Sequence, residues 1–242
     1  MRNRILALGA LLAAAPLAQA DIIGAGASVS YWDAEVAGKA GQKGDLLDVE
    51  NDLDLGDNSN TTIALYLEHP VPLLPNVRIA HSSLDQSGDS ELTTDFGGIG
   101  AGVPVTSDLE FEQTDLTLYY EVLDNWVNLD LGITARDFSG ELVVTQVGGA
   151  ISDTTKVDAV VPMGYVAARF DLPFTGASVG AEGNAISFDG DSMYDVNAYG
   201  QYEIALVQLR LGYREIAVDY EDGSDRFDID VSGPFISAGL SF

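Results

Sequence analysis

The 242-residue chain lacks cysteine, has only two histidines, and sets 11 lysines and arginines against 38 aspartates and glutamates. Without cysteine there is no disulfide framework, no thiol nucleophile and no thiolate metal site. A formal net charge of −27 excludes nucleic acid and anionic membrane surfaces as electrostatic partners. After residue 20 no apolar run approaches the roughly 20 residues that a transmembrane helix needs. The longest such run, 158–170, is interrupted by Pro162 and Gly164.

The first twenty residues have the composition of a secretory signal. Arg2 and Arg4 precede an apolar run from Ile5 to Leu17, and an A-x-A cleavage pattern follows at 18–20. The pattern predicts a cleaved signal peptide over 1–20 and an exported mature chain over 21–242.

Alternation of apolar and polar residues, which is typical of strands, recurs along the mature chain. Each alternating segment is longer than the typical globular strand of about 5–6 residues. Each matches the roughly 9–11 residues of a tilted transmembrane strand. The ten predicted strands are 22–33, 59–68, 76–87, 109–121, 126–139, 158–170, 176–188, 193–203, 206–219 and 232–242.

The connections between these strands alternate between long and short. Short periplasmic turns and longer outer loops are the rule in outer-membrane barrels. We therefore predict an all-β protein: one transmembrane antiparallel β-barrel over 21–242, with ten strands, short periplasmic turns and long acidic extracellular loops. Eight strands are the alternative, because the short connection "FDGDSM" would allow strands near 193–219 to pair above the membrane.

The chain ends in "GPFISAGLSF", with apolar residues at alternate positions before the aromatic Phe242. This ending resembles the C-terminal signal that the barrel assembly machinery of Gram-negative bacteria recognises. The mature chain is similar to small, uncharacterised outer-membrane barrel proteins of gammaproteobacteria. The resemblance implies an outer-membrane location and brings no functional motif with it. Aromatic girdles are expected at Trp126, Tyr120, Tyr202, Phe170, Phe174 and Phe242 near the turns, and at Tyr31, Trp32, Phe138, Phe188, Tyr194 and Tyr220 near the loops.

Charged residues that alternate with apolar ones must face the lumen, since Arg or Lys facing mid-bilayer lipid costs about 2–4 kcal/mol. Two interpretations follow. The charges pair and plug the interior, or the arginines line a small pore. The candidate lumen network comprises Glu68, Arg78, Asp115, Asp130, Arg136, Glu182, Asp195, Glu203, Arg210 and Arg214.

Enzymatic chemistry has one weak candidate. His81 and Ser83 share a strand face, and this spacing is similar to the His-x-Ser arrangement of lipid A deacylases. A nucleophile also needs an orienting acid, which the sequence does not place. Ten strands also resemble the omptin proteases, but no long loop here contains a histidine. His69, beside Pro70, is expected to be solvated.

Two loop segments are conspicuous. Asp52, Asp54 and Asp57 suggest oxygen ligands for Ca²⁺, yet the calcium-loop pattern is incomplete and a solvated acidic loop is expected. The acidic segments 45–57 and 219–230 would support diffuse divalent-cation bridging to lipopolysaccharide phosphates. The glycine-rich "GGIGAGVPV" (97–105) is not a dinucleotide fingerprint, and we expect a loop tip that folds toward the lumen.

Three functions therefore compete. The first is a non-enzymatic, porin-like barrel of structural or small-solute channel type. The second is a lipid A-modifying enzyme that uses His81 and Ser83. The third is a surface protein that binds cations, lipopolysaccharide or a partner. No pattern predicts a cofactor or a metal site.

Overall fold

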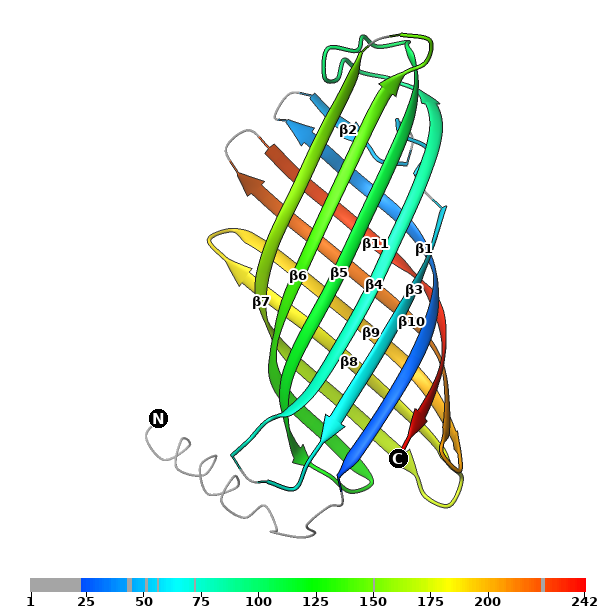
Figure 1. Ribbon diagram of the computed structural model, residues 1–242, viewed down its shortest axis with the longest axis vertical. Helices are drawn as coiled ribbons and strands as arrows, with labels where there is room; N and C mark the ends of the chain where they lie inside the picture. Colours follow the sequence, from blue (N-terminus) through cyan, green and yellow to red (C-terminus); the bar gives the residue numbers. More distant parts are fainter. Residues whose placement is uncertain are drawn as a thin grey trace, which may run out of the picture.

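The computed structural model describes residues 23–42, 45–50, 52–55, 57–71, 73–149, 151–222 and 225–242, so the predicted signal peptide lies outside the described residues. The described chain is a closed antiparallel barrel of ten long strands with one short extra strand, β2 (Figure 1). No helix in this part of the chain is long and apolar enough to cross a membrane.

Apart from the short β2, strands that follow one another in the chain are neighbours in the sheet, and β11 pairs with β1 to close the ring. The short β2 pairs only with the end of β1. The strands are β1 (Gly24–Gln42), β2 (Asp45–Asp48), β3 (Asp57–Glu68), β4 (Asn76–Glu91), β5 (Pro104–Leu123), β6 (Val127–Gln146), β7 (Ser152–Leu172), β8 (Ala177–Phe188), β9 (Asp191–Ile204), β10 (Val207–Asp222) and β11 (Asp225–Ser241).

The ten-stranded prediction is confirmed and the eight-stranded alternative is wrong. β9 and β10 pair from Ile204↔Val207 up to Ser192↔Asp219, and both belong to the closed ring. Phe242 is fastened to the first strand by two backbone hydrogen bonds with Ala25, of 2.8 and 3.1 Å. The terminus therefore closes the barrel, which explains its alternating apolar residues.

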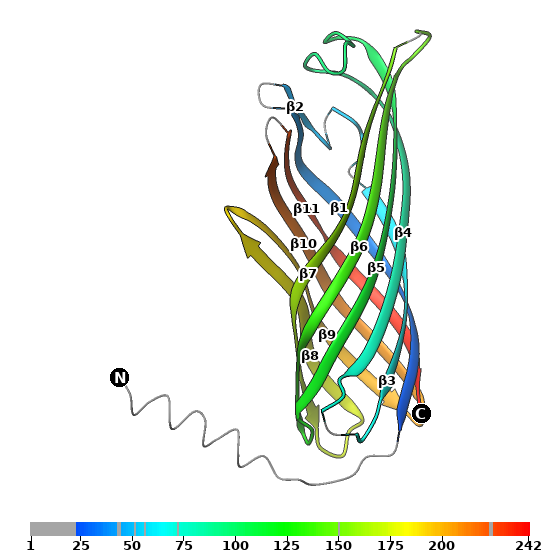
Figure 2. The ribbon, with the colours of Figure 1, turned by 60° about the vertical axis from the view of Figure 1, so that its left-hand side comes forward.

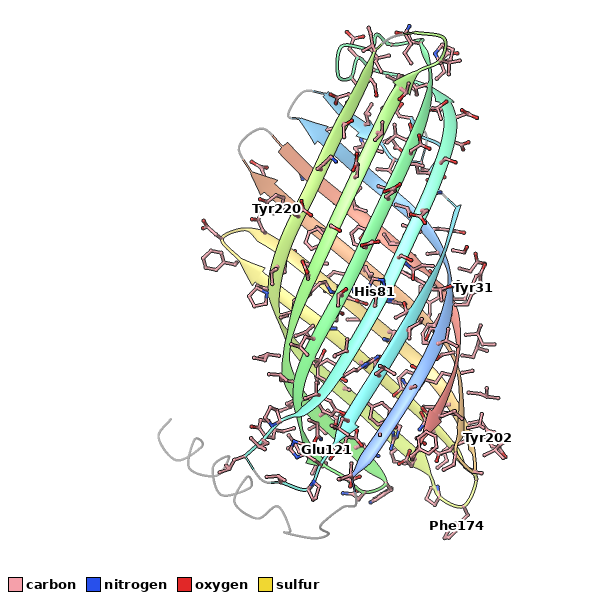
Figure 3. The ribbon with its side chains drawn as sticks, in the orientation of Figure 1. Tyr31, His81, Glu121, Phe174, Tyr202 and Tyr220 are labelled. Carbon is pink, nitrogen blue, oxygen red and sulfur yellow. The ribbon has the colours of Figure 1, made fainter. Side chains whose placement is uncertain are left out.

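An apolar belt surrounds the half of the barrel that carries the short turns. Large apolar side chains there point outward and are exposed, among them Val29, Ile63, Leu65, Leu116, Leu131, Val179, Leu209, Leu211, Ile236 and Leu240. Such a belt is the lipid-facing surface of a membrane barrel. Figure 3 places Tyr202 and Phe174 at the turn end of the barrel and Tyr31 higher on its wall.

The expected outer girdle is wrong at two positions. Trp32 is only 5% exposed, and its indole nitrogen donates to the carbonyl of Gly233 inside the barrel. Phe138 also points inward, with its ring 6.0 Å from that of Phe111. Both rings pack in the interior because they fall on the inward-facing parity of β1 and β6.

The strands continue beyond the belt as a sheet in water, where we had expected loops. Along β5 the outward positions change from Leu116 and Leu118 to Glu112, Glu110 and Asp108, while the inward positions change from polar to apolar. The alternation persists with inverted polarity, because the sheet leaves lipid and enters water. β4 to β7 consequently extend farthest at the top of Figure 1.

The outer end of the barrel is filled by an apolar core. The first two outer connections supply six of its buried side chains, and the inward faces of β1, β5 and β6 supply the rest. Gly97 and Gly98, with φ of 56° and 84°, form the tight turn that lets Phe96 and Ile99 pair. The buried members are Val36, Leu47, Val49, Leu53, Leu55, Leu92, Ile99, Val105 and Val144.

Asp52 fastens this core and is not the solvated acid that we expected. It is 3% exposed, and its carboxylate accepts hydrogen bonds from the backbone N–H of Asp48 at 2.8 Å and of Thr93 at 3.2 Å. The Ser90 hydroxyl donates to the Asp52 carbonyl. Within the described ranges no group of three or more acidic or histidine side chains is arranged to hold a metal ion.

Substituting Asp52 by alanine is expected to loosen the apolar core without opening the barrel. The N–H donors of Asp48 and Thr93 lose their acceptor, which costs roughly 1–3 kcal/mol. We expect proteolysis within 45–57 and 92–103 to become about tenfold faster. Asp108→Ala, on the exposed face of β5, is the matched control and is expected to leave cleavage unchanged. Equal cleavage of both variants would contradict the assigned role.

Candidate functional site

The lumen contains a buried ion-pair tier built from four strands. Arg136 on β6 donates to both carboxylate oxygens of Asp115 on β5, at 2.8 and 2.7 Å. The same guanidinium reaches Asp195 on β9 at 2.6 Å. Arg214 on β10 binds Asp195 with two further hydrogen bonds of 2.8 and 2.7 Å. We call Asp115, Arg136, Asp195 and Arg214 the middle tier.

The middle tier is largely buried. Arg136 has no exposed side-chain surface, and Asp195 is 4% exposed. The guanidinium of Arg214 lies 4.7 Å from the ring centre of Trp32, which is close enough for a cation–π contact. Arg136 thereby ties β5 and β6 to β9 across the interior, and Arg214 links this tie to β1.

A second group of charges, the lower tier, lies nearer the short turns. Arg78 on β4 forms a two-bond pair with Glu182 on β8, at 3.0 and 3.1 Å. Asn197 also donates to Glu182, at 3.3 Å. Arg210 lies 3.9 Å from Glu182 and 4.4 Å from the ring centre of Tyr199. Since β4 and β8 lie on different sides of the ring, the pair of Arg78 and Glu182 also crosses the lumen.

The remaining predicted residues belong to neither tier. Glu68 accepts a hydrogen bond from the Tyr119 hydroxyl at 2.8 Å. Asp130 faces inward on β6 and is in register with Glu121 of β5. Glu203 lies at the end of β9 and is exposed to solvent, outside the closed lumen. These residues were predicted to face the lumen, but alternation along one strand cannot identify partners on other strands.

Sequence reasoning missed the neutral partners of the charges. Trp32 was assigned to the girdle, and Tyr119, Tyr199 and Asn197 were not singled out. Their only signal was parity, because each falls on the inward position of its strand. Gln201 likewise falls on an inward position, and its side-chain oxygen accepts a hydrogen bond from Arg210 at 2.7 Å.

A small cavity of about 100 Å³ lies beside the tiers. Charged side chains line one side, including Arg78, Arg210 and Glu182. Serine, threonine and alanine side chains of β1, β3, β4 and β11 line the other. Its volume has room for a few water molecules, and it is far smaller than the 300–1,000 Å³ that is typical of small-molecule sites.

The two histidines lie outside the lumen. His81 and Ser83 occupy exposed, outward-facing positions of β4. His81, labelled in Figure 3, has its Nδ1 3.0 Å from the Thr114 hydroxyl. His69 was expected to be merely solvated, but it makes two contacts within its turn. Its Nδ1 accepts from the N–H of Val71 at 3.3 Å, and its Nε2 lies 3.1 Å from the carbonyl of Pro75. His69 therefore organises the first short turn.

Comparison with known proteins identifies the fold class. No family model and no curated protein matches the chain. The outer membrane protease OmpT from Escherichia coli is similar in structure, with a TM-score of 0.62 over 93% of this chain and 98% of that chain, at 11% identity. The translocator domain of the autotransporter NalP from Neisseria meningitidis gives 0.49 over 99% and 96%, at 9% identity. The chain thus has the fold of the outer-membrane β-barrels.

Removing the central cation is expected to destabilise the barrel strongly. Arg136→Ala leaves Asp115 and part of Asp195 buried without their counter-charge, and such a loss typically costs about 3–5 kcal/mol. Denaturant unfolding of the lipid-reconstituted protein, followed by tryptophan fluorescence, measures this change. Arg226→Ala is the control, since its pair with Asp228 spans 3.6 Å between exposed groups and is worth about 0–1 kcal/mol. Equal stability of both variants would contradict the role assigned to Arg136 in holding the barrel together.

Proposed function

We propose that this protein is an integral outer-membrane β-barrel of structural type, non-enzymatic, whose lumen does not conduct. The observation that carries the proposal is the pair of ties across the interior. Arg136 binds Asp195 at 2.6 Å, and Arg78 binds Glu182 at 3.0 Å. An open pore needs a continuous wet path, and these pairs occupy its cross-section at two levels.

The apolar core at the outer end supports the same conclusion. Leu47, Leu53, Leu92 and Ile99 are each 1% exposed where the mouth of a pore would lie. A solute would therefore meet an apolar cap and then two charged tiers in series. The porin-like, small-solute channel that the sequence also allowed is the less favoured form of this function.

Insertion by the barrel assembly machinery fits the position of the last strand. β11 pairs with β1 over almost its whole length, and Phe242 is hydrogen-bonded to Ala25 at the rim. The final strand is thus the element that closes the ring. Location in the outer membrane of a Gram-negative bacterium is part of this proposal, and the apolar belt supports it.

Lipid A modification by His81 and Ser83 is a weaker proposal. The imidazole nitrogen Nδ1, which an orienting acid would bind, lies instead against the hydroxyl of Thr114. Glu112 is in register with Ser83 rather than with His81. The arrangement lacks the base-to-acid contact that activates a nucleophile.

Single-channel recording in planar bilayers tests the closed lumen. We expect no steady conductance from the refolded wild-type protein, because both ties are intact. Arg136→Ala/Arg210→Ala is the comparison variant, and it removes one cation from each tier. A steady wild-type conductance whose ion selectivity shifts in this variant would show an open lumen lined by functional arginines, and would overturn the proposal.

A second candidate function is binding of lipopolysaccharide through divalent cations on the outer wall. The supporting observation is a row of like charges in register above the apolar belt. Asp85 of β4 opposes Glu110 of β5, which in turn opposes Glu141 of β6. Opposed like charges destabilise a sheet, and cations shared with lipid phosphates would relieve this repulsion. Lys156 offsets the row only at its end, 2.7 Å from Glu141.

Thermal unfolding in lipopolysaccharide-containing bilayers tests this second function. We expect millimolar Mg²⁺ to raise the Tm of the wild type by a few degrees, since screening an exposed charge row is worth about 1 kcal/mol. Glu110→Gln is expected to remove most of this Mg²⁺ dependence. Glu203→Gln, at the opposite end of the barrel, is the control. A Tm that does not change with Mg²⁺ in any of the three proteins would refute cation bridging.

A further inference from the structure

The barrel wall has a gap above the membrane, because two adjacent ladders differ in length. The β6–β7 ladder continues from Val127↔Phe170 up to Thr145↔Ser152. The β7–β8 ladder stops at Gly164↔Ala185. Residues 152–163 of β7 therefore have no partner on β8, and Figures 1 and 2 both show the β8–β9 hairpin leaning away from this part of β7.

The corresponding edge on the other side of the tall sheet is covered. β4 loses its β3 partner above Thr61↔Ser83. There the first outer connection lies against the inward face of β4 beside this edge, since a Cβ on the inward-facing Gly88 would be 2.4 and 2.6 Å from the carbonyls of Leu53 and Asp54. No strand of the described chain covers the β7 edge in the same way. An uncovered edge is uncommon in native sheets and needs a physical reason.

Pro162 explains why the ladder stops. Continuing the register would pair Met163 with Ile186, Pro162 with Ser187 and Val161 with Phe188. Proline has no N–H to donate and is confined to sheet edges. β8 then turns back after Phe188, so the wall stays open above this level.

The interior behind the gap is apolar. Val161 and Met163 point inward from β7, and Phe138 of β6 packs against Phe111 of β5. Across the gap, Ile186, Met193, Ile216 and Val218 take the inward positions of β8, β9 and β10. Several of these side chains are only half-buried. Between the middle tier and the strand tips, the charged inward positions of the described residues are Asp153 of β7, near the outer end, and Asp191 at the start of β9.

The gap begins where the apolar belt ends. Val160, which points outward beside it, is 67% exposed, and Phe188 at the tip of β8 is 77% exposed. Pro162 and Ala185 lie on the outward faces between them. The flanks are thus apolar at the lower end of the opening, where it adjoins the apolar belt, whereas Asp158 and Lys156 point outward higher on β7. The lower end is therefore accessible to the acyl chains of outer-leaflet lipids.

We propose that this opening admits an acyl chain of an outer-leaflet lipid, which binds the apolar interior above the middle tier. The middle tier forms a charged floor, so the chain enters from the side and cannot pass through. The half-buried apolar side chains behind the gap would then be covered by the bound acyl chain instead of by a strand of the wall. The site is separate from the closed lumen below.

Quenching by brominated lipid tests the proposal. In a Trp126→Phe background, which removes the lipid-exposed native tryptophan, Phe138→Trp places a reporter behind the gap. The protein is reconstituted in phosphatidylcholine with dibrominated or unbrominated acyl chains. We expect bromination to reduce the Phe138→Trp emission at least twofold. Leu131→Trp, on the lipid-facing wall, is the positive control, and the background protein with only the buried Trp32 is the negative control.

Closing the gap distinguishes entry from the side from other routes. Because the chain contains no cysteine, Val161→Cys/Phe188→Cys offers a single disulfide across the opening. We expect the oxidised form to lose the quenching of the Phe138→Trp reporter and reduction to restore it. Pro162→Val, which permits β8 to extend its ladder, should reduce quenching in the same direction. The proposal would be overturned if brominated lipid quenched Leu131→Trp but not Phe138→Trp. It would also be overturned if quenching of Phe138→Trp were the same with the disulfide oxidised and reduced.

Discussion

The rest of the structure depends on one constraint: the strands keep their alternation while the polarity of the two faces inverts. In the lower half, apolar side chains face out and polar ones face in, as lipid requires. In the upper half, acids face out and apolar side chains face in, as water requires. The change occurs between Leu116 and Glu112 on β5 and between Tyr213 and Glu215 on β10. The same strands are thus a membrane barrel below and a water-exposed sheet with an apolar core above.

The middle tier lies at this inversion. Below it, Arg78 and Arg210 both lie at the carboxylate of Glu182 within the lumen, and above it most inward positions are apolar. Burying an ion without a partner is unfavourable by several kcal/mol, so the arginines and acids are matched across the ring. A lumen built in this way is closed by the interactions that stabilise it, which links the stability of the barrel to its inability to conduct.

Function in such a barrel then belongs to its wall and outer end. The tall sheet of β4–β7 has two edges, and the chain treats them differently. The connection through Asp52 covers the β4 edge, whereas Pro162 ends pairing along the β7 edge. The acidic outward face and the open edge are both products of the sheet extending beyond the membrane, and each gives the protein a surface that a barrel confined to the membrane would lack.

The sequence by itself determined the barrel, the ten strands, the inward and outward faces, and the role of Phe242 in closing the ring. The reason is that alternation with a period of two is a local pattern, and a polar side chain facing lipid is energetically unfavourable. It did not determine how far the strands extend, since inverted polarity with many acids resembles a loop. It also left partners open. Arg136 and Asp195 are 59 residues apart, and Arg78 and Glu182 are 104 apart. Only the closed ring, with its fixed register and tilt, brings such pairs together, and the same closure turned Trp32 and Phe138 inward.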